Sequence, residues 1–271
     1  MGTRVYTPEW EVKHAQLPQS DIVPLKALPT DFNATTNWPQ CASVIGHIRD
    51  QSDCGCCWSF GSTESFNDRL CIVHNYTGQV SSQDTCSCCD PDFGCDGSNG
   101  CDGGFTEDAF NYFVKHGVVT GGDNPDVGKG DTCFPYQLAM CDHHEGGPYT
   151  PCPNLCPNEC NTPACPASTG CTESKYPTAW AKDKHFAKTA YGVSGVDKIM
   201  TDIMTNGPVS ASFTVYSDFL TYKSGVYVNN GGSVLGGHAV RILGWGVDAG
   251  TPYWYVANSW NNYCKYRIMY Y

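Results

Sequence analysis

The sequence predicts an α+β protein with two lobes, of which the first is helical and disulfide-rich and the second is an antiparallel β-barrel. Two observations predict this division. Most of the cysteines lie before residue 176, in a region with helical periodicity and long loops. Runs of β-branched and aromatic residues separated by glycine-rich turns follow, which is typical of antiparallel strands. A chain of 271 residues is long enough for one large core or two closely packed lobes.

Two helices are predicted in the first lobe. A stripe at every fourth position after Cys57 indicates a buried helix that begins near this cysteine. The stripe consists of Trp58, Ser62, Phe66 and Leu70. The run from Thr106 to Gly117 predicts a second helix with a cap at its start, because apolar residues follow Thr106 at helical spacing.

The second lobe is predicted to contain one helix and four strands. Apolar residues from Val196 to Met204 indicate a short amphipathic helix, which Asn206-Gly207-Pro208 ends. The β-branched and aromatic runs predict strands at Val209–Tyr216, Tyr222–Val228, His238–Val247 and Tyr253–Asn258.

Charge and cysteine content exclude several classes of partner and compartment. A formal net charge of −11 disfavours nucleic acid and anionic membranes, and it is tolerated in an acidic compartment. No stretch is long and apolar enough to span a membrane. Eighteen cysteines, with glycosylation sequons at Asn33 and Asn75, favour the oxidising secretory pathway. The polar start MGTRVYTPEW is no signal peptide, so we expect that Met1 is not the natural start of a secreted product.

Two cysteine-rich regions need an explanation. Residues 120–175 show no helical or strand periodicity, and a loop region this long needs disulfides to hold it together. The stretch QSDCGCCWSF contains Cys54, Cys56 and Cys57 within four positions. A disulfide scaffold, a metal site and a nucleophile each produce such a cluster.

The sequence around Cys57 favours a nucleophile at this position. The N-terminus of a helix stabilises a thiolate, and Gly55 permits a tight turn before the helix. A base is expected from the other lobe, where Gly236 and Gly237 precede His238 at the start of the most apolar strand. Asn258 ends the next predicted strand, from which its side chain could orient an imidazole.

Three blocks of sequence resemble the active-site blocks of papain-family cysteine peptidases. They are residues 51–60, Gly236-Gly237-His238-Ala239 and Asn258-Ser259-Trp260. Further motifs resemble the cathepsin B group in particular, and the resemblance runs from about Leu28 to Trp260. These motifs are NDRLC at 67–71, YSDFL at 216–220, YKSGVY at 222–227, RILGWG at 241–246, GTPYW at 250–254 and the occluding-loop segment CDHH at 141–144.

The resemblance implies a two-lobed papain-like fold with an occluding-loop insertion, and it assigns the catalytic roles. Cys57 would be the nucleophile, His238 the acid and base, and Asn258 the residue that orients His238. Gln51 and the backbone N–H of Cys57 would form the oxyanion hole.

The resemblance also assigns residues that bind substrate. Gly103 and Gly104 would bind the substrate backbone, with Gly55 and Gly237 close by. Trp260 would shield the Asn258–His238 contact. His143 and His144 would face a substrate's C-terminal carboxylate, with Asp50 tethering His143.

The implied activity is hydrolysis of peptide bonds through a thioester acyl-enzyme, with no cofactor and no metal. Both endopeptidase and C-terminal dipeptidase activity are expected, in an acidic compartment. The expected partners are peptide and protein substrates and inhibitors of the cystatin or propeptide type, and the protein would be a monomer. Its location would be the secretory pathway, either a lysosome-like compartment or the extracellular space.

Domain limits and disulfides follow from the same resemblance. Residues 1–27 would be the tail of a propeptide and residues 28–271 the peptidase domain, with a helical lobe at about 37–175 and a β lobe at about 176–271. Six disulfides are implied, namely Cys41–Cys71, Cys54–Cys101, Cys88–Cys165, Cys89–Cys95, Cys133–Cys171 and Cys141–Cys152. Five cysteines have no family counterpart, and of these Cys156 and Cys160 could pair with each other. The remaining three are Cys56, Cys86 and Cys264.

The sequence departs from the family pattern after Trp260. The acidic residue that accepts a basic side chain in the S2 subsite is missing, so no such preference is expected. The loop arginine that anchors the occluding loop is also missing, with Tyr149 near its place. A less tightly held loop and a shift towards internal cleavage are therefore expected.

Two alternatives remain open at the level of sequence. One is a homologue with weak catalysis, because the altered end of the second lobe could fail to hold His238. The other is a cysteine-rich metal-binding protein, with His143 and His144 as additional ligands. Its candidate thiolates are Cys86, Cys88, Cys89, Cys156, Cys160 and Cys165.

Overall fold

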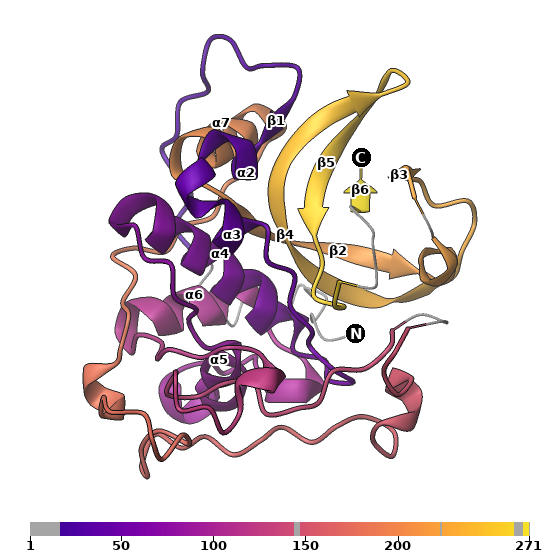
Figure 1. Cartoon of the computed structure of the whole chain (residues 1–271). Helices are drawn as coiled ribbons and strands as arrows, with labels where there is room; N and C mark the ends of the chain where they lie inside the picture. The colour runs from indigo at the N-terminus through magenta and orange to yellow at the C-terminus, as the bar shows by residue number, and fades with distance from the viewer. Residues whose placement is uncertain (1–16, 144–146, 223, 263–267, 271) are drawn as a thin grey trace.

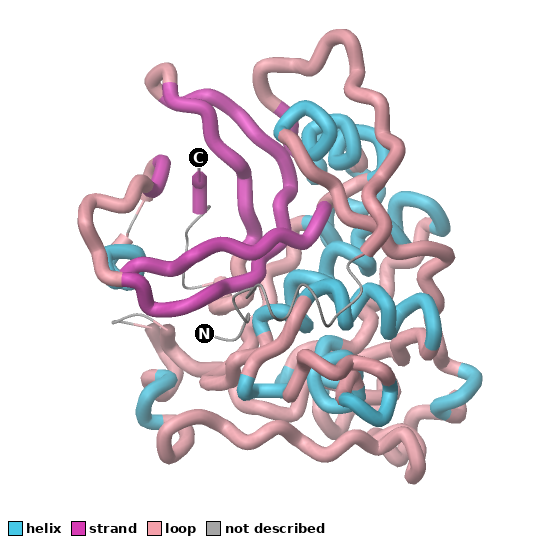
Figure 2. The backbone as a smooth tube through the Cα atoms, turned by 180° about the vertical axis from the view of Figure 1, so that it is seen from behind, coloured by secondary structure: helices cyan, strands magenta, loops and turns pink. Residues whose placement is uncertain are grey.

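Helices and strands segregate into two lobes, so the predicted α+β class is confirmed (Figure 1). The computed structural model describes residues 17–143, 147–222, 224–262 and 268–270. The view from behind shows the same division, with the strands gathered on one side and long loops joining the helices on the other (Figure 2). None of the described helices combines the length and hydropathy that a membrane span requires.

The described helices include the three that the sequence predicts, and the bounds of these three agree closely with the prediction. The helices are α2 (Ala34–Asn37), α3 (Ala42–Ile45), α4 (Cys57–His74), α5 (Ser82–Cys88), α6 (Thr106–Lys115) and α7 (Val196–Asn206). The predicted cap of α6 is wrong, because Thr106 is already helical and Phe105 precedes it without a side-chain capping bond. The hydroxyl of Thr106 bonds instead to the carboxylate of its neighbour Glu107.

Helix α4 lies between the two lobes and carries Cys57 at its first position. Every residue from Cys57 to Asp68 is buried, because α5 and α6 cover one side of the helix and the strands β2 and β4 cover the other. A helix that is surrounded in this way has no solvent-facing side, and its sequence therefore shows only weak amphipathic periodicity.

The β lobe is a single six-stranded sheet. Its strands are β1 (Phe32–Asn33), β2 (Val209–Tyr216), β3 (Val226–Tyr227), β4 (Val234–Asp248), β5 (Thr251–Ala257) and β6 (Ile268–Tyr270). They follow the order β1-β4-β5-β6-β3, and β2 also pairs with β4. The long strand β4 is thus the centre of the sheet and the part that meets α4.

The expectation of an antiparallel barrel is wrong in two respects. Within the described residues the sheet is open, since no pairing joins β2 to β3. The strands β3 and β6 pair in parallel, whereas all other pairs are antiparallel. A 3₁₀ turn at Ser217–Thr221 follows β2 and leaves only two residues for β3, so the chain does not return alongside β2 as a hairpin would.

Disulfides hold the irregular segments of the helical lobe. All six pairs implied by the resemblance are confirmed, and Cys156 pairs with Cys160. The alternative of a metal-binding protein is therefore wrong, because disulfides use five of its six candidate thiolates. Cys264 lies outside the described residues.

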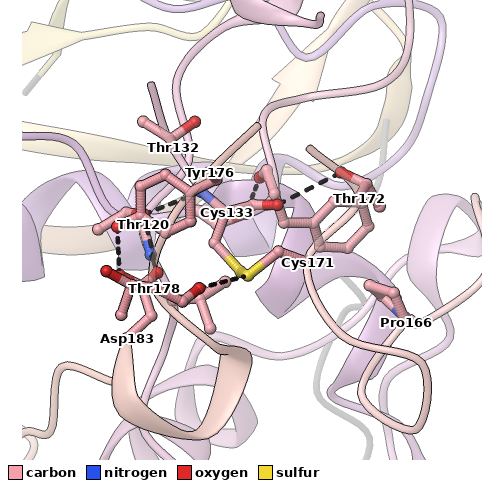
Figure 3. The surroundings of a disulfide bond; sticks show 12 residues. Thr120, Thr132, Cys133, Pro166, Cys171, Thr172, Tyr176, Thr178 and Asp183 are labelled. Carbon is pink, nitrogen blue, oxygen red and sulfur yellow. Dashed lines mark hydrogen bonds between the residues drawn. A yellow bond between two sulfur atoms is a disulfide. The ribbon is translucent and has the colours of Figure 1, made fainter. Parts of the chain in front are cut away.

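The disulfide between Cys133 and Cys171 shows how such a link supports a loop (Figure 3). Thr172 donates its N–H to the carbonyl of Cys133 at 3.0 Å, which extends the covalent link by a hydrogen bond. The N–H of Cys133 donates to the hydroxyl of Thr120, which in turn donates to Asp183 at 2.8 Å. Backbone groups that lack a helix or strand are thus satisfied by side chains.

Candidate active site

Cys57 lies where α4 begins, with its side chain buried between the lobes. As the first helical residue it has an N–H that the helix itself does not use, and the helix dipole favours negative charge at this end. The N–H of Ala239 on β4 points at its Sγ atom from 3.4 Å. This thiol therefore meets two features that stabilise a thiolate.

His238 and Asn258 are hydrogen-bonded across neighbouring strands. The ring atom Nε2 of His238 lies 2.7 Å from Oδ1 of Asn258, which also accepts the N–H of Ser259 at 2.8 Å. Because a carboxamide oxygen only accepts, Nε2 carries the proton in this arrangement. The opposite atom, Nδ1, has no hydrogen-bond partner among the described residues. Nδ1 is therefore the ring nitrogen that the contact with Asn258 leaves unused.

The side chain of Gln51 is fixed at both ends of its amide. Oε1 accepts the hydroxyl of Ser259 at 2.6 Å, and Nε2 donates to the carbonyl of Cys54 at 2.8 Å. The backbone N–H of Gln51 also donates to the carbonyl of Ser259. A primary amide has two N–H groups, so one remains to bind an oxyanion together with the N–H of Cys57.

Trp260 separates the imidazoles of His238 and His143. Its ring lies 4.8 Å from the His238 ring and stacks on the His143 ring at 5.4 Å, with an interplanar angle of 9°. The indole is buried, so it shields the His238–Asn258 contact from water. The role that the resemblance implies for Trp260 in the active site stays a prediction.

Asp50 holds the base of the loop that contains His143. One carboxylate oxygen lies 3.0 Å from Nε2 of His143, and the other accepts the N–H of Cys141 at 3.2 Å. Asn261 donates to Asp50 at 3.1 Å and to the carbonyl of Cys141 at 2.8 Å. The disulfide Cys141–Cys152 closes the loop. His144 lies outside the described residues, so its predicted place beside His143 stays a prediction.

The predicted substrate-binding glycines are buried. At two of them, Gly103 and Gly104, the backbone conformation or the lack of space favours glycine over any other residue. Gly103 has a φ of +101°, in a region that favours glycine. A Cβ at Gly104 would lie 2.6 Å from the ring of Trp58, so a side chain has no room there. Gly55 precedes the start of α4, and Gly237 precedes His238 on β4.

A buried ionic cluster lies behind the site. Arg241 on β4, three residues after His238, contacts Asp68 and Glu64 on α4 at 2.7 and 2.9 Å. Two carboxylates share one guanidinium away from solvent, so one of them tends to keep its proton. Burial raises the pKa of Glu64 to about 7 and that of Asp68 to about 6, although Arg241 opposes both shifts. The cluster joins the element that carries Cys57 to the element that carries His238.

Sequence reasoning missed the supporting residues Ser259, Asn261 and Tyr136. Tyr136 donates its hydroxyl to the carbonyl of Gln51 at 2.6 Å and lies in the disulfide-rich region, where no periodicity marks it. Asn261 has a φ of +57°, a conformation that asparagine tolerates better than most residues. An asparagine directly after the Asn-Ser-Trp block was the one available signal.

Comparisons with known proteins place the chain among cysteine proteases. Residues 28–266 match the family model described as papain family cysteine protease. The chain is 49% identical over 241 residues to cathepsin B-like cysteine proteinase 5 of Caenorhabditis elegans, covering 87% of this chain and 67% of the relative. It is 46% identical over 262 residues to cathepsin B-like cysteine proteinase 4 of the same nematode, covering 94% and 72%. A procathepsin B structure from Trypanosoma congolense superposes with a TM-score of 0.75 and 28% identity, covering 99% of this chain and 80% of that one.

Proposed function

The chain belongs to the papain family of cysteine proteases, and from this premise we propose that Cys57, His238, Asn258 and Gln51 form its catalytic site. The observation that carries the proposal is the His238–Asn258 bond of 2.7 Å beside a buried thiol at a helix start. It leaves Nδ1 of His238 to exchange a proton with Cys57. The relatives support a cysteine peptidase of the cathepsin B-like type.

The reaction proceeds in two stages that use the same residues. The thiolate of Cys57 attacks the carbonyl carbon of the peptide bond, and the developing oxyanion accepts bonds from Gln51 Nε2 and the N–H of Cys57. Protonated His238 gives its proton to the leaving amine, which leaves a thioester on Cys57. His238 then removes a proton from water, which hydrolyses the thioester and restores the thiolate.

The substrate runs along the cleft between the lobes. Gly103 and Gly104 let the substrate backbone approach closely on the non-primed side. On the primed side, His143 and His144 bind the terminal carboxylate of peptides that end two residues after the cleaved bond. The enzyme therefore removes C-terminal dipeptides and also cleaves internal bonds.

The segment before residue 28 is the tail of a propeptide, and residues 28–271 form the peptidase domain. The family model begins at residue 28, which supports this limit. Part of the segment lies on the β lobe, where Ser20 donates to the carbonyl of Gly192 and Leu25 donates to the hydroxyl of Thr201. Inhibitors of the cystatin and propeptide type would compete for the same cleft, and the protein acts as a monomer.

The protein acts in an acidic compartment of the secretory route or outside the cell. Seven disulfides need an oxidising environment during folding. The sequon residue Asn75 is exposed at the end of α4, where a glycan has room. A loss of mass when the native protein is treated with an N-glycosidase tests whether Asn75 carries a glycan.

The experiment that tests the catalytic assignment compares Cys57→Ser with Cys56→Ser. We expect Cys57→Ser to lose both peptide hydrolysis and covalent labelling by a cysteine-directed epoxide. Cys56→Ser should retain both, because the neighbouring side chain points into the helical lobe towards Tyr136. Labelling that maps to Cys56 would contradict the assignment.

A further inference from the structure

Two thiols beside the candidate nucleophile have no role in the proposed reaction. Cys56 and Cys86 are outside the seven disulfides, and they are 0% and 1% exposed. Cys56 directly precedes Cys57, and Cys86 lies on α5. Neither has a counterpart in the cathepsin B pattern that the rest of the sequence resembles.

The two side chains meet in one sulfur cluster. The Sγ atoms of Cys54, Cys56 and Cys86 all lie within 4.8 Å of one another. Cys54 is already bonded to Cys101, so Cys56 and Cys86 are the two members that can still react. Burial and the neighbouring Cys56 thiol raise the pKa of Cys86 well above its ordinary value, which keeps the unreacted Cys86 thiol protonated.

The cluster is linked to the active site through hydrogen bonds and through the chain. The Cys56 thiol lies 3.2 Å from the hydroxyl of Tyr136, which donates to the carbonyl of Gln51. Cys56 is also the residue that caps α4, where its carbonyl accepts the N–H groups of Ser59 and Phe60. A displacement of Cys56 is therefore transmitted to the start of the helix and to Cys57.

Two disulfides hold the end of helix α5 that carries Cys86. The disulfides Cys88–Cys165 and Cys89–Cys95 fix the last turn of α5 and the residue after it, directly beyond Cys86. A disulfide brings two sulfur atoms to about 2.0 Å from each other. If the two thiols combine, their sulfur atoms must therefore approach each other, and the part of this movement that falls on Cys56 reaches the start of α4.

We propose that Cys56 and Cys86 are a disulfide-forming site that a small-molecule disulfide such as oxidised glutathione closes, and that closure lowers turnover at Cys57. In the first step one protein thiolate attacks oxidised glutathione, which forms a mixed disulfide and releases one reduced glutathione. In the second step the other protein thiolate displaces the second reduced glutathione. Two protein thiols lose two electrons and two protons, and one oxidised glutathione becomes two reduced ones.

Formation of the other disulfides of this chain requires an oxidant of the same class. Conditions that form seven disulfides act on Cys56 and Cys86 while the chain folds, before burial protects them. In the folded protein both thiols are buried, so closure must follow a local opening and is slow.

The first experiment detects the bond without relying on peptidase activity. The full chain with Cys57→Ser is incubated in buffers with increasing ratios of oxidised to reduced glutathione and then unfolded and alkylated without a reducing agent. Mass spectrometry after reduction and a second alkylation locates each protected cysteine. We expect Cys56 and Cys86 to become protected together, with a mass loss of two hydrogens and no glutathione adduct on either.

Single variants provide the matched controls. With Cys86→Ala or Cys86→Ser added, Cys56 should remain alkylatable or carry one glutathione, and unchanged melting temperatures would verify that both variants fold. The site is overturned if Cys56 and Cys86 stay alkylatable in oxidised glutathione or if each carries its own glutathione. The appearance of Cys101 as a new thiol would also overturn it, because the pair would then have attacked the Cys54–Cys101 bond.

The second experiment tests the effect on turnover and rests on the proposed function. A reversible peptide aldehyde protects Cys57 during oxidation and is then removed before activity is measured without reductant. We expect wild type to lose roughly 10-fold or more in turnover, since displacement of a reacting group by about 1 Å can cost up to 10²-fold. Cys86→Ala should lose none, and dithiothreitol should restore wild type. Equal activities of the oxidised wild type and Cys86→Ala would overturn the effect on turnover, whereas inactivity of both before oxidation would contradict the proposed function instead.

Discussion

The Nη1 atom of Arg241 lies 2.7 Å from both carboxylate oxygens of Asp68. This contact spans the two lobes, because Arg241 lies on β4 and Asp68 on α4. Nη2 of Arg241 also contacts Glu64 at 2.9 Å and the carbonyl of His47 at 2.8 Å. The cluster therefore connects the helix that carries Cys57 to the strand that carries His238.

Stability should fall as the pH rises through the range in which Glu64 loses its proton. The folded pKa of about 7 exceeds the ordinary value of 4.5, so the folded state holds a proton that the unfolded state has lost between these values. The contribution is complete at acidic pH and is lost as the pH rises towards about 7. It amounts to about 3 kcal/mol, at 1.36 kcal/mol for each unit of pKa.

Urea unfolding at pH 5 and pH 7.5 measures this effect in wild type and in Glu64→Gln. The free energy of unfolding should differ less between the two pH values in Glu64→Gln than in wild type, since an amide does not titrate. The exposed residue Asp197 provides a matched control, because Asp197→Asn also removes one carboxylate. Equal pH dependence in wild type and Glu64→Gln would contradict the prediction.

Removal of the Arg241 guanidinium should destabilise the fold more at neutral than at acidic pH. Arg241→Met leaves Glu64 and Asp68 buried without the guanidinium that they share, and breaking a buried pair costs about 3–5 kcal/mol. At pH 5 both carboxyl groups can take up protons, because burial also raises the pKa of Asp68 to about 6. Melting temperatures across this pH range give the comparison, and a uniform loss would argue against an electrostatic role.

Removal of C-terminal dipeptides should require a negative charge at the end of the substrate. An imidazolium that bonds a carboxylate gains about 1.5–3 kcal/mol, so amidation of the substrate should slow this cleavage by roughly 10- to 100-fold. His143→Ala combined with His144→Ala should remove the difference between acid and amide while sparing internal cleavage. Initial rates on both substrate forms measure this, and equal rates in wild type would mean that the two histidines do not bind substrate.

Asn261 should control the balance between the two kinds of cleavage. Its amide donates to Asp50 and to the carbonyl of Cys141, so Asn261→Asp replaces two donated bonds with repulsion at the base of the loop. Aspartate also tolerates the left-handed backbone at this position, which keeps the comparison matched. We expect dipeptide removal to fall several-fold relative to internal cleavage, on the order of 1 kcal/mol per lost bond. An unchanged ratio would show that Asp50 alone anchors the loop.

Ser259 should act as a positioning residue for the oxyanion hole. Ser259→Ala removes the hydroxyl that holds the amide of Gln51, so this amide can rotate away. Turnover should then fall by about 10-fold with little change in KM. This loss is smaller than the roughly 10²- to 10³-fold loss in turnover that follows removal of an oxyanion-hole donor. Ser259→Thr keeps the hydroxyl and should retain most activity. In a Gln51→Ala background the loss of Ser259 should have no further effect, and an additional loss there would point to a structural role.

Features that depend on local sequence were predictable from it. The start of α4 at Cys57 and the bounds of β2 follow from periodicity and from neighbouring glycine and proline residues. The parallel pairing of β3 with β6 was not predictable, since it joins residues more than 40 positions apart through only two residue pairs. Short strands with few alternating residues have no periodic signal, so their register is set by tertiary packing.

The candidate site also contains some residues that the sequence predicts and others that it does not. The Cys, His and Asn blocks stand out in the sequence because each needs particular residue types in a fixed order. Tyr136 supports the site from a distance and lies in a segment without periodicity, and only the folded chain brings it to Gln51. The capping role expected of Thr106 failed for a related reason, because its hydroxyl found a neighbouring side chain instead of a backbone N–H.

All seven disulfides lie between Cys41 and Cys171, so the described part of the β lobe is held by packing and hydrogen bonds alone. The covalent links reduce the conformational freedom of the helical lobe even when it unfolds, whereas the described residues of the β lobe have no such restraint. Amide hydrogens of β2 and β5 should therefore exchange with deuterium before those of α4 and α5. Since His238 and Asn258 belong to the lobe that opens first, heat should abolish peptidase activity while the disulfide-linked half still protects its backbone.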